Sequence, residues 1–151
     1  KLEFDEFYNF MKEGLQKDVN LKQMRFLYDG MDLDGSHNLD QSEILECAEK
    51  MKCKDFKWVT KMIFRGADKD NSRKVSIAEL KDACDGLGDE SFDQTKFEEK
   101  CKLELGGKKK ELEYWEFWKL ISGETIPEDS ADRDPYEGKL PEEKSKCCLL
   151  L

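Results

Sequence analysis

The sequence has few of the residues that zinc sites and many enzyme active sites require. It contains one histidine, His37, and none of its six cysteines lies in a CxxC pair. A zinc site needs several cysteine or histidine ligands at close spacing, so none is expected, and the cysteines are typical of reduced, cytosolic thiols. The chain also lacks a GxSxG motif and a phosphate-cradling glycine loop. We therefore do not expect an enzyme.

Long apolar runs and a positive charge balance are also missing. No apolar run approaches the eighteen or more residues that a membrane span needs. The 151 residues include 26 Lys and Arg against 35 Asp and Glu, for a net charge of −9. This charge repels the phosphate backbone, so binding to nucleic acid is not expected. An acidic chain is better suited to binding cations or basic partner helices.

The first positive signal is the stretch from Asp32 to Glu43, DLDGSHNLDQSE, called here the first loop. Ca²⁺ takes six to eight oxygen ligands, and a twelve-residue loop supplies them from positions 1, 3, 5, 7, 9 and 12. Position 7 offers its backbone carbonyl, position 9 binds directly or through water, and position 12 offers both carboxylate oxygens. The predicted ligands are Asp32, Asp34, Ser36, Asn38, Asp40 and Glu43.

The same pattern recurs in the second loop, Asp68 to Glu79, DKDNSRKVSIAE. This repeat argues against the alternative, an isolated polar surface turn. The predicted ligands are Asp68, Asp70, Ser72, the Lys74 carbonyl, Ser76 through water, and Glu79. The second loop has three carboxylates and also carries Lys69, Arg73 and Lys74, whereas the first has four carboxylates and no Lys or Arg. We therefore predict two calcium sites, with the first loop binding more tightly.

These loops resemble the calcium loops of the EF-hand family, and the chain is similar to calmodulin-like proteins with four EF-hand repeats. The closing residues Glu43 and Glu79 lie 36 residues apart, and the same period marks further units closing at Glu6 and Glu116. The first unit is truncated because the chain begins inside its loop, at Lys1.

Two features depart from the family pattern. Position 6, usually glycine, is His37 in the first loop and Arg73 in the second. The turn there needs a positive φ, which costs a residue with a Cβ about 1–2 kcal/mol, so we expect weakened binding and not its loss. In the fourth unit Leu105, Gly107 and Lys109 replace the first three oxygen ligands, so that degenerate loop should be empty.

The resemblance implies an all-α fold of paired helix-loop-helix units, with short β-bridges between the paired loops. Leu39 is expected opposite Leu2, and Val75 opposite Leu112. Apolar residues at three-to-four spacing on both sides of each loop favour the helices. The expected organisation is an N-terminal pair (1–53), a C-terminal pair (54–122) and a flexible, disordered acidic tail (123–151), which is dominated by Gly, Pro, Asp, Glu and Ser.

The chain closes with two cysteines and three leucines. The last four residues fit the C-a-a-X pattern, which predicts prenylation of Cys148 and favours geranylgeranyl because the final residue is Leu. A single lipid holds a membrane only marginally, so Cys147 is a candidate for a second lipid. The alternative is an unmodified, frayed apolar terminus.

The resemblance implies a calcium sensor that changes conformation on binding Ca²⁺ and then engages a protein target through an amphipathic helix. With a lipid at Cys148, such a sensor would be cytoplasmic, at the cytoplasmic face of a membrane. Two alternatives stay open: a passive calcium buffer, and a regulatory subunit bound constitutively to an enzyme or channel.

Overall fold

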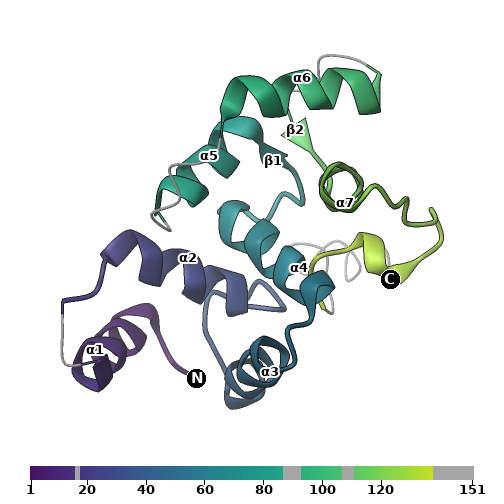
Figure 1. Cartoon of the computed structure of the whole chain (residues 1–151). Coiled ribbons are helices and arrows are strands. Elements are labelled where there is room, and N and C mark those ends of the chain that lie inside the picture. The colour runs from purple at the N-terminus through teal and green to yellow at the C-terminus, as the bar shows by residue number, and fades with distance from the viewer. Residues whose placement is uncertain (16–17, 87–92, 107–110, 138–151) are drawn as a thin grey trace, which may run out of the picture.

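The computed structural model describes residues 1–15, 18–86, 93–106 and 111–137, which are mostly helical (Figure 1). The predicted helical character is confirmed. The α-helices in this part of the chain are α1 (Phe4–Leu15), α2 (Leu21–Met31), α3 (Gln41–Lys52), α4 (Phe56–Ala67), α5 (Ile77–Gly86), α6 (Gln94–Leu105) and α7 (Tyr114–Ser122). The shorter elements are strands β1 (Val75–Ser76) and β2 (Glu111–Leu112) and the 3₁₀ helix η1 (Ala131–Arg133).

Each intact loop lies between two helices, with α2 and α3 flanking the first loop and α4 and α5 flanking the second. The exit helix of each loop begins with a reciprocal cap. Asp40 Oδ1 accepts from the Glu43 N–H at 2.9 Å, and Glu43 Oε1 accepts from the Asp40 N–H at 3.0 Å. Ser76 and Glu79 repeat the exchange at 3.0 Å in both directions. These bonds satisfy donors at the helix start that would otherwise lack partners.

The predicted bridges between loops are confirmed. Leu2 lies antiparallel to Leu39, with N–H to carbonyl distances of 2.7 and 3.0 Å. Val75 pairs with Leu112 in the antiparallel β1–β2 ribbon. Leu39, Val75 and Leu112 have no exposed surface. The bridges therefore fix the loops and also contribute apolar side chains to the core.

Helices α2 and α4 cross closely because a glycine stands at the crossing point of each (Figure 1). A Cβ added to Gly30 would lie 2.8 Å from Met62 O, and one added to Gly66 would lie 2.8 Å from Phe26 O. Each of these helices also contributes to both hydrophobic cores: Trp58 and Met62 of α4 lie in the core cluster of Phe7, Tyr28 and Leu39, and Phe26 of α2 lies in the other cluster. The two hydrophobic cores thus meet where α2 packs against α4.

The prediction of a flexible tail from residue 123 onward is wrong for residues 123–137, which pack against the helices. Ile126 and Tyr136 are 4% and 5% exposed. The Arg133 guanidinium lies 4.5 Å from the Trp115 ring centroid and donates to the Ile126 carbonyl. Figure 1 shows the segment returning from α7 towards α4. Two apolar anchors in a polar sequence are enough to order it, because α4 and α7 supply the partners.

The predicted lipidation sites Cys147 and Cys148 lie outside the described residues, as does the rest of 138–151. Within the described ranges, no helix is both long enough and apolar enough to cross a bilayer. The cysteines that can be described there as free thiols are Cys47, Cys53 and Cys101.

Candidate metal centre

The first loop brings three carboxylates together. Asp32, Asp34 and Glu43 each offer an oxygen, and these oxygens lie within 4.8 Å of one another. Asp32 and Glu43 are only 3% and 4% exposed. Among the side chains that the structure describes (residues 1–14, 18–83, 93–106 and 111–137), no other group of three acidic, histidine or cysteine residues converges in this way. Such a buried cluster repels itself until a cation joins it.

Two further predicted ligands of the first loop, Ser36 and Asn38, lie beside this cluster. Ser36 Oγ lies 2.9 Å from the Asn38 carbonyl oxygen and 3.5 Å from Asp32 Oδ1. Ser36 Oγ thus donates hydrogen bonds to both the Asn38 carbonyl and Asp32 Oδ1, which places these two predicted ligands beside the carboxylate cluster.

Backbone N–H groups hold the carboxylates of the first loop in place. Asp32 Oδ2 accepts from the His37 N–H at 2.9 Å, and Glu43 Oε2 accepts from the Leu33 N–H at 2.7 Å. His37 has φ 64°, so the predicted positive φ at position 6 is confirmed. This positive-φ turn lets the His37 N–H donate to Asp32 Oδ2, while Asp32 Oδ1 faces Ser36 Oγ.

Four of the six predicted ligands of the second loop repeat this arrangement. Asp68 Oδ2 accepts from the Arg73 N–H at 2.9 Å, and Asp68 Oδ1 lies 3.2 Å from Ser72 Oγ. Ser72 Oγ lies 3.0 Å from the Lys74 carbonyl, and the Ser72 N–H donates to Asp70 Oδ1 at 3.2 Å. Arg73 has φ 63°, as predicted for position 6.

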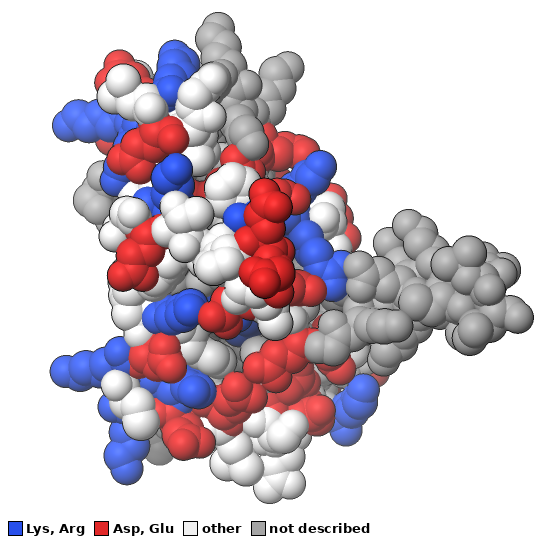
Figure 2. All heavy atoms as spheres, turned by 90° about the vertical axis from the view of Figure 1, so that its right-hand side faces the viewer, with Lys and Arg blue, Asp and Glu red and all other residues white. Residues whose placement is uncertain are grey.

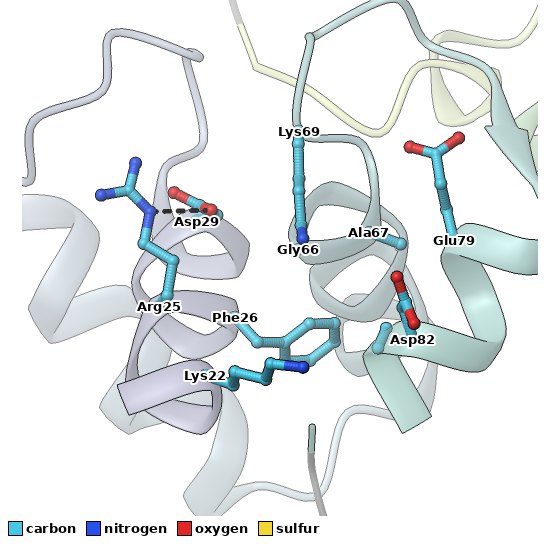
Figure 3. A pocket seen from close by; sticks show the side chains of 10 residues that line it. Lys22, Arg25, Phe26, Asp29, Gly66, Ala67, Lys69, Glu79 and Asp82 are labelled. Carbon is cyan, nitrogen blue, oxygen red and sulfur yellow. Dashed lines mark hydrogen bonds and ion pairs between the residues drawn. The ribbon is translucent and has the colours of Figure 1, made fainter. Parts of the chain in front are cut away.

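Glu79, the closing residue of the second loop, is placed differently from Glu43. The Lys69 N–H, equivalent to that of Leu33, donates to the Ala67 carbonyl at 3.1 Å. Glu79 instead lies at the edge of a cavity of about 110 Å³ between α2, α4 and α5, beside Asp82 (Figure 3). Glu43 is thus held by the N–H groups of both Leu33 and Asp40, whereas Glu79 is held by the Ser76 N–H and lines the cavity.

Burial changes the proton affinity of the first ligand in each loop. It raises the pKa of Asp32 to about 7, and the nearby Asp34 and Glu43 carboxylates add to the effect. Burial likewise raises the pKa of Asp68 to about 6, with a further contribution from Asp70. Because calcium would bind the ionised carboxylate, protons would compete with it at both positions.

Calcium binding should weaken as the pH falls from 8 to 6. With these pKa values, we expect the affinity to drop roughly tenfold at the first loop and roughly twofold at the second. In the absence of calcium, lowering the pH has the opposite effect: it stabilises the fold. A folded-state pKa above the unfolded value of Asp32 means that its contribution to stability is present at low pH and lost as the pH rises towards 7. Calorimetric titrations at both pH values check this, and equal affinities would contradict it.

Residues that the sequence did not single out also contact the loops. Asn71 Nδ2 donates to the Gly35 carbonyl at 3.2 Å and lies 3.1 Å from His37 Nε2, so it joins the second loop to the first. The Tyr136 hydroxyl lies 3.0 Å from Asp68 Oδ2. The one sequence signal for Tyr136 was an aromatic residue in a polar segment. Of the degenerate fourth loop, residues 107–110 lie outside the described ranges.

Comparison with known proteins identifies no relative of this chain. No protein-family model matches the chain, and a search of curated proteins gives no significant match. The assignment of the two loops therefore depends on their own sequence and geometry.

Proposed function

We propose that this chain is a calcium-binding protein of the EF-hand type with two calcium sites, one in each intact loop. The observation that carries the proposal is the cluster of three carboxylates in the first loop, whose oxygens lie within 4.8 Å of one another. Hard oxygen donors favour Ca²⁺ over softer metals. The residues that would hold the second ion are Asp68, Asp70, Ser72, the Lys74 carbonyl and Glu79.

The surface charge supports a cation-binding role. Acidic side chains gather in the middle and lower part of the face shown in Figure 2, and most Lys and Arg lie towards its edges. Together with the net charge of −9, this distribution attracts divalent cations and basic protein segments.

The first pair of hands offers a surface on which calcium binding could act, which favours a sensor. Helix α3 contains Glu43 in its first turn and also carries Ile44 and Leu45, which are 36% and 60% exposed. These two side chains line an open cavity of about 430 Å³ with Leu2 and Leu39. An ion that draws on Glu43 would shift α3 and this apolar surface with it. The partner that fits is an amphipathic helix with a basic polar face.

The C-terminal sequence supports a membrane tether for such a sensor. A lipid on Cys148, with a second on Cys147, would place the protein at the cytoplasmic face of a membrane. The intact mass of the protein isolated from its native cell tests this. A gain of one or two prenyl or palmitoyl masses is expected, and an unmodified chain would contradict the tether while leaving calcium binding unaffected.

Calorimetry with Ca²⁺ tests the central proposal. We expect two ions per chain in a titration up to millimolar calcium, and no binding in that range would refute the calcium role.

A hydrophobic dye separates a sensor from a passive buffer. Dye fluorescence should rise with calcium, and Leu45→Ser should reduce the rise because Leu45 belongs to the proposed surface. Leu103→Ser is the matched control, since Leu103 is 85% exposed on α6, away from the first loop. Calcium binding with no dye response would favour the buffer, and a single partner that co-purifies without calcium would favour a constitutive subunit.

A further inference from the structure

Residues 134–137, called here the clasp, contact both intact loops. On the second loop, the Tyr136 hydroxyl lies 3.0 Å from Asp68 Oδ2 and 3.1 Å from Asn71 Oδ1. The Asp134 carboxylate pairs with the Arg73 guanidinium at 3.0 Å. These contacts reach positions 1, 4 and 6 of the second loop. Asp68 is one of its predicted calcium ligands, and the Arg73 N–H holds that ligand.

On the first loop, the clasp meets the residue that holds the closing glutamate. The Glu137 N–H donates to the Leu33 carbonyl at 2.7 Å. The N–H of the same Leu33 donates to Glu43 Oε2 at 2.7 Å. One residue of the first loop therefore bonds the clasp through its carbonyl and the calcium ligand Glu43 through its amide.

A buried arginine fixes the clasp where α2 and α4 meet. Arg65 is 2% exposed, and its guanidinium donates to the Gly30 carbonyl at 2.8 Å and to the Pro135 carbonyl at 2.6 Å. A buried cation is costly to leave unpaired, so these carbonyls stabilise Arg65 as much as it stabilises the clasp. The clasp is thus a built part of the fold.

We propose that the clasp couples the two calcium loops, with Tyr136 as a positioning residue for Asp68. The inference rests on the proposed calcium function. Tyr136 and the Arg73 N–H both hold Asp68 Oδ2, which leaves Oδ1 beside Ser72 Oγ and the Lys74 carbonyl, where an ion would bind. Calcium and the clasp therefore favour the same orientation of Asp68.

The coupling follows from the shared contacts. Calcium in the first loop fixes Glu43 and Leu33, which favours the docked clasp, and the docked clasp favours the binding orientation of Asp68. By linkage, calcium in the second loop must strengthen binding in the first by the same factor. The direct contact of Asn71 with the Gly35 carbonyl acts in the same direction. Because the two loops belong to different bridged pairs, this coupling is separate from that through Leu2–Leu39 and Val75–Leu112.

The test measures calcium affinity at the second loop with the first loop working or disabled by Glu43→Gln. In the unmodified full chain we expect the second loop to bind about fivefold or more tightly when the first loop works. In Tyr136→Phe, which removes the hydroxyl and keeps the ring, the ratio of the two second-loop affinities, with the first loop working and with it disabled, should fall towards one. Tyr114→Phe is the matched control, because it removes another buried tyrosine hydroxyl, which lies 3.5 Å from the Lys57 carbonyl and away from both loops.

The outcomes separate the clasp from the calcium function. An unchanged ratio in Tyr136→Phe overturns the coupling, and an equal loss in Tyr114→Phe overturns the positioning role. Two ions that bind the unmodified chain independently would also refute the clasp while leaving the proposed calcium function intact. A chain that binds no calcium refutes the proposed function itself.

A second measurement follows the clasp in the unmodified full chain. Trypsin cleavage after Arg133 requires local opening of the docked segment, so calcium should slow cleavage of the Arg133–Asp134 bond several-fold, as followed by mass spectrometry. The doubly disabled Glu43→Gln, Glu79→Gln chain should show no such protection. A cleavage rate that calcium leaves unchanged in the unmodified chain overturns the proposal.

Discussion

Replacing Glu43 with glutamine is expected to remove the tighter of the two calcium-binding steps. The change keeps the size of the side chain and deletes the negative charge that closes the first loop. Glu43 is buried against Asp32 and Asp34, so its charge acts on an ion with little screening by water. We expect the affinity of the first loop to fall roughly 100-fold, equivalent to about 2.7 kcal/mol.

Two matched variants give this prediction its control. Glu49→Gln removes an exposed carboxylate from the same helix, α3, and should leave both binding steps unchanged. Glu79→Gln should remove the weaker step with a smaller effect, because Glu79 lies at the edge of a cavity and outside the carboxylate cluster of the described chain. Stepwise calorimetry of the three variants is the measurement. Loss of the weaker step in Glu43→Gln would contradict the assignment of the tighter site.

The loops were predictable from sequence because their chemistry is local. Ligand spacing within twelve residues fixes which oxygens can reach one ion, and the structure gathers those of Asp32, Asp34 and Glu43. The bridges were predictable for a similar reason, since the pairing of loops follows from the repeat, and Val75 does lie opposite Leu112. The position of Glu79 was not predictable, because it depends on the cavity that α2, α4 and α5 form beside it.

The packing of the segment after α7 could not be predicted from composition. Its polar residues are typical of a flexible tail, and its order depends on a few long-range contacts, such as Arg133 over Trp115 and Arg65 with the Pro135 carbonyl. The partners of these residues are up to 70 positions away in the chain. A pattern read within a short window contains no information on contacts of this kind.

The close crossing of α2 and α4 leads to the second large prediction, which concerns Gly66. A Cβ at this position would lie 2.8 Å from both Phe26 Cε2 and the Phe26 carbonyl oxygen. The backbone oxygen cannot move away without displacing α2. Alanine gains about 1 kcal/mol over glycine in a helix. We expect the clash to outweigh this gain, so that Gly66→Ala lowers the free energy of unfolding by about 2 kcal/mol.

Gly14→Ala is the matched control, because no atom lies within 4 Å of a Cβ added to Gly14 in α1. There the helix propensity acts alone, and the variant should be more stable by about 0.5–1 kcal/mol. Urea unfolding of both variants gives the two free energies. The same gain in stability for both would show that the crossing can relax. A loss confined to Gly66→Ala, together with weaker calcium binding at both loops, would show that the crossing holds the ends of α2 and α4, from which Asp32 and Asp68 enter their loops.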